Sequence, residues 1–302
     1  MKQEFYSHGK LLLTAEYLVL DGANALAFPT KYGQSLIVDN GKKNTIAWKS
    51  YDHTGKLWLD FCFTIEEIKL FNRKVENDRD RLISILMNAH KINSSFLGNT
   101  DGFSIITKLD FPNNWGLGSS STLINNISKW ANLDPYQLLS VTFGGSGYDI
   151  AAANNDCPII YTKKENQSIS KKQLINWDFK DHLFFVHLNK KQNSRDSIAN
   201  YQKITKPKII QIQKINELTI DLCNCNNLTE FKNLIERHEK IVSNLIQQKP
   251  IKEVLFKDYS GVIKSLGAWG GDFVLVSGNE NDYQYFLNKG FKTIIPFKKM
   301  IL

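Results

Sequence analysis

The change of pattern at residues 102–131 constrains the fold of this chain more than any other feature. Residues 102–111 alternate apolar and polar side chains, as a half-buried strand requires, and Pro112 ends that strand. Residues 119–131 then carry apolar side chains at helical spacing behind a serine-rich start that can cap a helix. Two glycines, Gly116 and Gly118, lie between the two patterns. The sequence therefore predicts a strand, a glycine-containing turn and a helix in direct succession.

This turn has the composition of a phosphate-binding loop. Gly116 and Gly118 let the backbone approach a ligand closely and adopt positive φ angles. The helix that follows offers unpaired N–H groups and the positive end of its dipole, and the serines at 119–121 add hydroxyl donors. A tight turn with an ordinary serine cap is the alternative interpretation.

Strands and helices mix along the rest of the chain. We expect further strands at 34–39, 45–49, 57–63, 183–188, 273–277 and 292–297. We expect further helices at 135–142, 148–153, 207–222, 228–247, 252–265 and 281–288. Because both kinds of element occur in both halves, the sequence predicts an α+β fold with a boundary near residues 160–180.

The composition is that of a folded globular protein. The hydrophobic fraction is 42% and the charged fraction 23%, far from a disordered composition. No apolar run approaches the roughly 20 residues that a membrane span needs, and the first residues lack a secretory pattern. The four cysteines lack the partners of a zinc site and are expected to be reduced. We therefore expect a cytoplasmic protein without a membrane partner.

The net charge of +8 is compatible with two kinds of anionic partner, nucleic acid or small metabolites. The lysines are dispersed along the chain, and no basic segment is interleaved with aromatic residues. We therefore expect a small-molecule substrate and no nucleic acid. The sequence leaves open whether the protein is a monomer or a homodimer.

Two common nucleotide-binding patterns are absent from the sequence. No G-x-x-x-x-G-K-[ST] segment occurs, and no G-x-G-x-x-G follows an expected strand. The H-R-D and D-F-G triplets of protein kinases are missing as well. A nucleotide bound by this chain would therefore be held by neither a P-loop nor a protein-kinase site.

Two further segments accompany the turn at 112–121. Residues 9–22 read GKLLLTAEYLVLDG, and residues 264–273 read KSLGAWGGDF. In order and spacing, the three segments resemble the signature motifs of the GHMP kinases, which include galactokinase, homoserine kinase, mevalonate kinase and phosphomevalonate kinase. A fourth segment, residues 144–153 (GGSGYDIAAA), resembles the catalytic-aspartate region of phosphomevalonate kinases and is similar to a bacterial group named GYDIA-family GHMP kinases.

The resemblance covers essentially the whole chain and implies the two-domain GHMP kinase fold. An N-terminal domain at 1–165 would be of the ribosomal protein S5 domain 2-like type and would bind ATP. A C-terminal domain at 166–302 would be ferredoxin-like, and the active site would lie in the cleft between the two. The implied activity is transfer of the ATP γ-phosphate to an anionic metabolite, with phosphomevalonate as the expected acceptor and Mg²⁺ as cofactor.

The resemblance also implies site residues. Lys10 and Asp149 would be catalytic: Asp149 would accept or orient the acceptor's hydroxyl proton, and Lys10 would stabilise the charge that develops there. ATP would be held by Pro112, Gly116, Leu117, Gly118, Ser119, Ser120 and Ser121, with Mg²⁺ at Ser120 or its neighbour Ser121. The substrate-binding residues would be Glu16, Tyr17, Gly145, Ser146, Gly147, Arg195, Gly267, Gly270 and Gly271. Arg195 belongs to a basic group behind an expected buried strand, and it could instead be ordinary surface charge.

Three departures from the family pattern bear on the substrate. Ala15 stands where the first motif has glycine, and Trp269 interrupts the glycines of the third motif. The acidic residue that binds Mg²⁺ in mevalonate kinase has no clear counterpart here, since only Asp134 lies between the second motif and Asp149. A mevalonate kinase, a related ATP-dependent decarboxylase and a non-catalytic relative therefore remain as alternatives.

Overall fold

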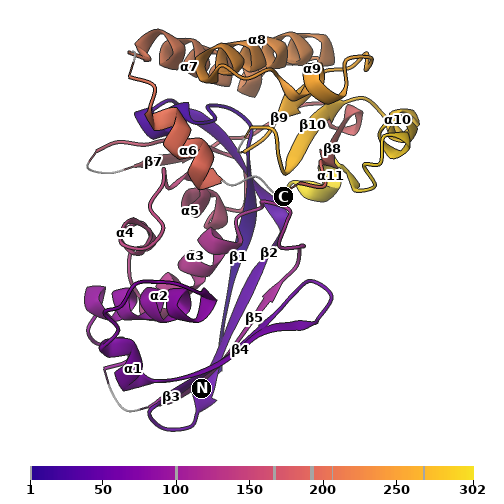
Figure 1. The fold of residues 1–302 in the computed structure, drawn as a ribbon. Coiled ribbons are helices and arrows are strands. Elements are labelled where there is room, and N and C mark those ends of the chain that lie inside the picture. Colours follow the sequence, from indigo (N-terminus) through magenta and orange to yellow (C-terminus); the bar gives the residue numbers. More distant parts are fainter. Residues whose placement is uncertain (1, 99–100, 166–167, 191–193, 206, 268) are drawn as a thin grey trace. The chain divides into compact units, whose positions relative to one another are not determined.

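The structure, a computed structural model, describes residues 2–98, 101–165, 168–190, 194–205, 207–267 and 269–302 (Figure 1). The chain divides into two compact units, each assembled from separate stretches. Unit 1 comprises residues 1–9, 32–113 and 117–154, and unit 2 comprises residues 10–31, 114–116 and 155–302. The predicted division at residue 165 follows sequence order and stays a prediction.

The sheet of unit 1 is built from the long strand β2 (Ala25–Gly41) and the strands that follow it. β2 pairs antiparallel with β5 (Gly102–Leu109), β5 runs parallel to β3 (Thr45–Tyr51), and β3 pairs antiparallel with β4 (Leu57–Thr64). The alternation predicted for β5 is confirmed, since Ile105, Thr107 and Leu109 are buried while Ile106 is exposed. β1 (Gln3–Leu12) also pairs with β2, and both strands have residues in both units.

Helices of unit 1 supply most of its apolar core together with the sheet. They are α1 (Ile65–Lys69), α2 (Asp78–Ile92), α3 (Ser119–Ala131), α4 (Pro135–Ser140) and α5 (Tyr148–Ala153). Side chains of α2 and α3 form one buried cluster with sheet residues such as Trp48, Phe63 and Ile105. The predicted strand–turn–helix succession therefore forms because β5 and α3 bury their apolar faces in the same core.

Unit 2 contains a separate four-stranded antiparallel sheet in the order β11–β8–β10–β9. Its strands are β8 (Leu183–His187), β9 (Ile263–Ser265), β10 (Phe273–Ser277) and β11 (Ile294–Pro296). Every residue of β8 and β10 is buried, so these strands read as continuous apolar runs. Elsewhere in unit 2, β6 (Ile159–Thr162) pairs with the first residues of β2 and with β7 (Ile169–Lys172).

The helices of unit 2 surround this sheet and the first motif. They are α6 (Ser194–Gln202), α7 (Ile209–Asn224), α8 (Leu228–Ile246), α9 (Ile251–Leu255), α10 (Tyr283–Asn288) and α11 (Phe297–Met300), with a 3-10 turn η1 at Leu18–Asp21. The long helices α7 and α8 lie side by side (Figure 1). The predicted helices at 207–222 and 228–247 are thus confirmed to within two residues at each end.

The predicted helix at 252–265 is wrong. The helix α9 ends at Leu255, and residues 263–265 form strand β9 instead. A Cβ at Gly261 would lie 2.2 Å from the carbonyl oxygen of Ser277, so this glycine allows close pairing with β10. Tertiary pairing therefore overrides the local apolar spacing that favoured a helix.

The α+β class is confirmed, with helices and strands in both units. Across the described ranges, none of the helices combines the length and the apolarity that crossing a membrane requires.

Candidate active site

The glycine turn forms an open helix N-terminus in the structure. Gly118 is the N-cap of α3 with φ of 90°, and Gly116 has φ of 65°, so both occupy the left-handed region that favours glycine. Gly118 offers no side-chain cap, and the first turn of α3 contains no acidic residue. The N-terminal N–H groups and the helix dipole can therefore serve an anionic ligand.

The serines of this turn differ in exposure. Ser120 is exposed and Ser119 is half-buried, while Ser121 is buried and donates its hydroxyl to the Gly118 carbonyl at 2.8 Å. Leu117 is fully buried and anchors the turn. Of the two hydroxyls considered for Mg²⁺, the geometry favours that of Ser120.

A buried polar network in unit 1 fixes α3 beneath the turn. Thr122 donates to the side chain of Gln34 at 2.7 Å, and Asn126 donates to the Gln34 carbonyl at 2.9 Å. Ser7 donates to Asn126 at 2.6 Å and accepts from Asn125 at 2.9 Å. Because buried polar groups are costly to leave unpaired, this network specifies one position for α3.

Asp149 lies on a second glycine-started helix of unit 1. Gly147 is the N-cap of α5 with φ of 87°, and Asp149 is half-buried in the first turn, where its Oδ1 accepts from the Ile150 N–H at 3.2 Å. Gly145 is exposed, with open space at its Cβ position, and Ser146 is half-buried. Helices α3 and α5 contact each other, so unit 1 places the predicted phosphate-binding turn and Asp149 on neighbouring helices.

Lys10 is tied to the turn within unit 2. Its Nζ donates to the Gly116 carbonyl at 3.0 Å, which links the first motif to the second. Asp272 of the third motif also packs against Gly116, because a Cβ there would come within 2.3 Å of the Asp272 carboxyl group. Asp272 itself has φ of 54°, and its backbone pairs with Lys190 and Leu188. Residues of the three predicted motifs therefore meet around Gly116.

The first motif continues into a turn at residues 15–17 with unusual backbone angles. Ala15 has φ of 66° and Tyr17 has φ of 62°, although neither is glycine. The hydroxyl of Tyr17 accepts from the Trp269 N–H at 3.2 Å, and its ring stacks on Tyr201 of α6 at 5.4 Å. Tyr201 in turn donates its hydroxyl to Asp21. The turn thus connects to the third motif and to α6 inside unit 2.

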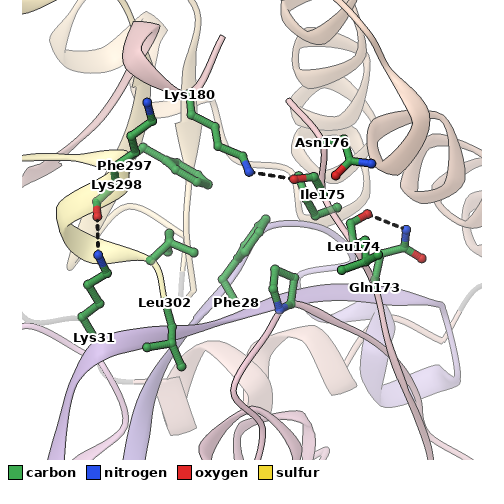
Figure 2. A pocket seen from close by; sticks show the side chains of 12 residues that line it. Phe28, Lys31, Gln173, Leu174, Ile175, Asn176, Lys180, Phe297, Lys298 and Leu302 are labelled. Carbon is green, nitrogen blue, oxygen red and sulfur yellow. Dashed lines mark hydrogen bonds between the residues drawn. The ribbon is translucent and has the colours of Figure 1, made fainter. Parts of the chain in front are cut away.

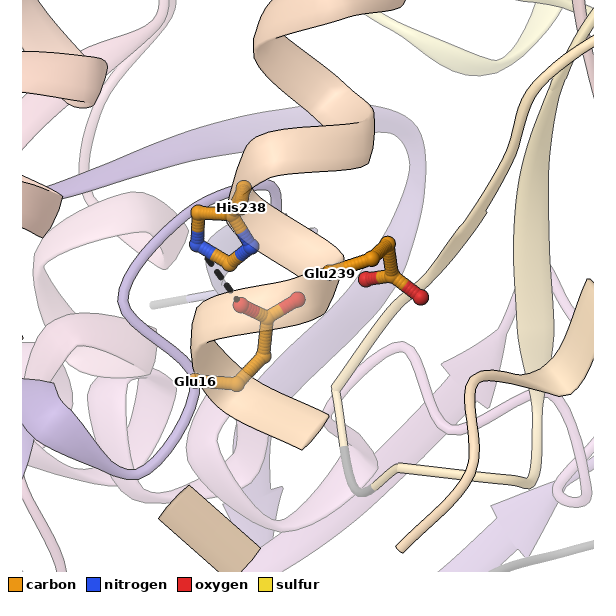
Figure 3. Close-up of side chains that lie close together, drawn as sticks. All are labelled: Glu16, His238 and Glu239. Atoms are coloured by element: carbon orange, nitrogen blue, oxygen red, sulfur yellow. Dashed lines mark ion pairs between the residues drawn. The ribbon is translucent and has the colours of Figure 1, made fainter. Parts of the chain in front are cut away.

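Four buried ionisable side chains lie close together at this turn: Glu16 of the turn itself, with His238, Glu239 and Lys264, hereafter the Glu16 cluster. Figure 3 shows Glu16, His238 and Glu239. Lys264 Nζ donates to Glu16 Oε1 and the Ser265 carbonyl and lies 3.0 Å from Glu239 Oε1. Glu239 Oε2 accepts from the backbone and hydroxyl of Ser265 at 3.2 and 3.0 Å. The Lys264 ammonium therefore makes two hydrogen bonds and a further ion pair with Glu239.

Glu16, His238 and Glu239 offer ligand types that metal ions use, but the lysine already supplies a cation among them. His238 Nε2 accepts from the Ala15 N–H at 3.1 Å, so that nitrogen carries no proton. We therefore interpret the cluster as a buried ion pair with a neutral histidine and assign no metal to it.

The cluster holds two carboxylates and one ammonium, so its charge is unbalanced when every group is ionised. Burial raises the pKa of Glu16 to about 7, against the opposing charge of Lys264. Burial alone would lower the pKa of Lys264, but the charges of Glu16 and Glu239 outweigh this effect, so the pKa of Lys264 is raised. Burial and the Lys264 charge hold the pKa of His238 well below its ordinary value. The raised pKa therefore lets Glu16 bind a proton near neutral pH.

Glu16→Gln should change how stability depends on pH. The pKa of Glu16 is above its ordinary 4.5, so its contribution is fully present below that value and is lost as pH rises through about 7. Glutamine does not titrate. The Tm of Glu16→Gln minus that of the parent should therefore rise between about pH 5 and about pH 8. Thermal scans of both proteins across this range check it, and a constant Tm difference would contradict the raised pKa.

Several predicted site residues are not brought together within one unit. Lys10 belongs to unit 2 and Asp149 to unit 1, so their pairing stays a prediction. The third-motif glycines Gly267 and Gly270 have φ of 64° and 89°, and Gly271 follows them; all three belong to unit 2. Pro112 precedes the turn in unit 1. Asp134 accepts from the Tyr136 N–H and caps α4.

Arg195 lies in α6, but its side chain and residue 191 fall outside the described part of the chain. Asp272, His238, Glu239 and Lys264 were not predicted as site residues. The Gly-Gly-Asp string was a local signal for Asp272, whereas nothing local distinguishes the other three.

A separate cavity of about 460 Å³ lies in unit 2 (Figure 2). Its walls combine apolar side chains such as Phe28 and Phe297 with three lysines. Lys31 donates to the Lys298 carbonyl at 2.8 Å, and Lys180 donates to the Ile175 carbonyl at 2.7 Å. Since no predicted site residue lines it, we assign it no ligand.

Comparison with known proteins identifies the fold. No protein-family profile matches the chain, and no curated protein matches it in sequence. Among solved structures, it is similar to mevalonate kinase from Methanococcus jannaschii, with a TM-score of 0.72 and 17% identity over 98% of this chain and 97% of that chain. The chain has the GHMP kinase fold.

Two further structures of this fold are similar over nearly the full length. Streptococcus pneumoniae phosphomevalonate kinase, in complex with phosphomevalonate and AMPPNP, has a TM-score of 0.69 and 15% identity over 97% of this chain and 99% of that chain. A mevalonate diphosphate decarboxylase from Legionella pneumophila has a TM-score of 0.58 and 14% identity over 98% of this chain and 100% of that chain. The GHMP kinase fold thus hosts both kinases and a decarboxylase.

Proposed function

We propose that this protein is an ATP-dependent kinase that phosphorylates an anionic small metabolite, with phosphomevalonate as the first candidate. The observation that carries the proposal is the hydrogen bond of Lys10 to Gly116 beside the open N-terminus of α3. It joins the cation expected in catalysis to the turn expected to hold phosphate. The fold shared with phosphomevalonate kinase and mevalonate kinase supports the same activity.

The residues of the turn fit a nucleoside triphosphate with Mg²⁺. The uncapped N–H groups at the start of α3 would hold phosphate oxygens, and the exposed hydroxyl of Ser120 would contact the metal. When bound, Mg²⁺-ATP supplies the phosphoryl group and neutralises part of its charge. The turn's own contribution is to fix those oxygens without reorganising, because α3 is held by its buried network.

Asp149 and Lys10 would act on the acceptor. In this proposal Asp149 takes up or orients the proton of the attacking hydroxyl, from the first turn of α5. Lys10 places a positive charge next to the developing alkoxide and hydrogen-bonds the Gly116 carbonyl. Positioning and charge compensation are the main demands that phosphoryl transfer makes of a protein.

The acceptor is inferred from charge and from motif strings. The net charge of +8 favours an anionic acceptor. The Gly-Ser-Gly-Tyr-Asp string at 145–149 and the Gly-Gly-Asp string at 270–272 resemble those of phosphomevalonate kinases. Mevalonate is the second candidate, since a mevalonate kinase is among the solved structures with the same fold.

An ADP-release screen of the purified protein tests this function. The acceptors would be phosphomevalonate, mevalonate, homoserine and simple sugars, each with Mg²⁺-ATP. We expect turnover with phosphomevalonate and weaker turnover with mevalonate. Release of CO₂ from diphosphomevalonate in a parallel assay would instead favour a decarboxylase. If none of the acceptors led to ADP release, the proposed substrate class would be contradicted.

Arg195→Ala should weaken the acceptor selectively. The phosphate that the acceptor already carries needs cationic partners, and Arg195 at the start of α6 is proposed as one of them. We expect the KM for phosphomevalonate to rise on the order of tenfold or more while the KM for ATP stays nearly unchanged. Steady-state kinetics at low and high salt measure this, and equal changes in both KM values would contradict it.

A further inference from the structure

The Glu16 cluster fastens three segments of unit 2 that are far apart in sequence. The turn at 15–17 supplies Glu16, the helix α8 supplies His238 and Glu239, and the strand β9 supplies Lys264. These side chains are buried, with Glu16 1% and Lys264 0% exposed. Burying charges is costly, so a cluster retained here has to be explained by what it holds in place.

The turn that it holds is strained. Ala15 has φ of 66° and Tyr17 has φ of 62°, a range that residues other than glycine rarely adopt, and Tyr17 combines it with ψ of −46°. Such conformations persist when surrounding contacts over-determine them. Here the Ala15 N–H donates to His238 Nε2, and the Glu16 carboxylate accepts from Lys264. The cluster therefore fixes both the backbone and the side chain of the turn.

The turn at 15–17 contacts two segments that carry predicted acceptor residues. Tyr17 accepts from the backbone N–H of Trp269, which lies between the third-motif glycines, and its ring stacks on Tyr201 near the end of α6, the helix whose second residue is Arg195. A displacement of the turn at 15–17 would therefore disturb both the third motif and α6. Neither contact involves the α3 turn expected to hold ATP.

We propose that Glu16 and Lys264 are positioning residues of the acceptor site, which act by holding Tyr17 against Trp269 and α6. This inference rests on the proposed kinase function. It assigns Glu16 an indirect role, in place of the direct substrate contact that its motif suggested.

The test compares Glu16→Met with Glu16→Gln. Methionine has a similar length but no acceptor for Lys264, and it leaves Lys264 and Glu239 as a balanced pair. Glutamine keeps an oxygen acceptor at the same place and removes only the charge. Lys172→Met, which breaks the exposed ion pair with Asp156, is the control for loss of a charge pair at the surface of unit 2.

Two readouts separate positioning from activity. Hydrogen–deuterium exchange of peptides covering 13–21, 194–202 and 266–275 should rise in Glu16→Met and stay near parental in Glu16→Gln and Lys172→Met. Steady-state kinetics should give a KM for phosphomevalonate that rises on the order of tenfold in Glu16→Met, with the KM for ATP nearly unchanged. A direct substrate contact would instead weaken the acceptor in Glu16→Gln as well.

Parental exchange in all three peptides of Glu16→Met would overturn the proposal, whether or not the protein turns over any acceptor. If the parent protein turned over no acceptor, only the kinase function would be contradicted, because the hydrogen–deuterium exchange measurement needs no substrate. Should Glu16→Met fail to fold, Tyr17→Phe removes the acceptor for the Trp269 N–H. Parental exchange at 266–275 in that variant would likewise overturn the proposed link.

Discussion

Asp149→Asn should lower turnover by about 10²-fold or more while leaving the Tm nearly unchanged. Asparagine keeps the shape of the side chain but cannot take up the proton of an attacking hydroxyl. Asp149 is half-buried at the start of α5, and the hydrogen bond that its carboxylate accepts from the Ile150 N–H can be kept by the amide oxygen of asparagine. ADP release under saturating substrates and a thermal scan measure the two quantities.

Lys10→Met is the companion variant. We expect a comparable loss of turnover, and a double variant far from additive, because the two residues would act on the same proton transfer. Lys172→Met provides a control lysine that is exposed and belongs to none of the motifs. Turnover of Asp149→Asn within a few-fold of the parent would mean that another group orients the acceptor.

Gly118→Val should weaken nucleotide binding strongly. Gly118 has φ of 90° at the N-cap of α3, and a β-branched side chain is strained there and would crowd the exposed N–H groups. We expect the Kd for Mg²⁺-ATP to rise on the order of 10²-fold. Isothermal titration calorimetry measures it directly.

Gly290→Val is the matched control for this substitution. Gly290 has φ of 88° in unit 2, and a Cβ there meets open space. It should bear a similar backbone strain without a change in nucleotide affinity. A folded Gly118→Val protein with parental ATP affinity would remove the turn from the nucleotide site.

The parts of the fold that sequence could predict are those set by local periodicity. The alternation at 102–111 and the helical spacing at 119–131 became β5 and α3, since each buries one face in a shared core. The helix predicted at 252–265 was wrong for a tertiary reason, because residues 263–265 pair with β10 as strand β9. Gly261, just before β9, allows the close approach to Ser277 of β10. Such pairing leaves no period in the sequence.

The candidate site divides in the same way. The glycine turn at the start of α3 was predictable because glycines and serines follow a strand directly, and its binding of phosphate stays a prediction. The Glu16 cluster was not, because its members lie at positions 16, 238, 239 and 264 and only folding brings them together. Ala15 illustrates the link between the two. Its φ of 66° explains why glycine suits this motif position, and the hydrogen bond to His238 is what fixes the alanine there.

Transfer of the γ-phosphate itself tests the kinase assignment most directly. The protein would be incubated with Mg²⁺-ATP labelled with heavy oxygen in its γ-phosphoryl group and with phosphomevalonate, and the products would be resolved by mass spectrometry. We expect the label in a diphosphorylated product, formed in a one-to-one ratio with ADP and lost in Asp149→Asn. Label found only in free inorganic phosphate, or no consumption of ATP with either phosphomevalonate or mevalonate, would contradict the account.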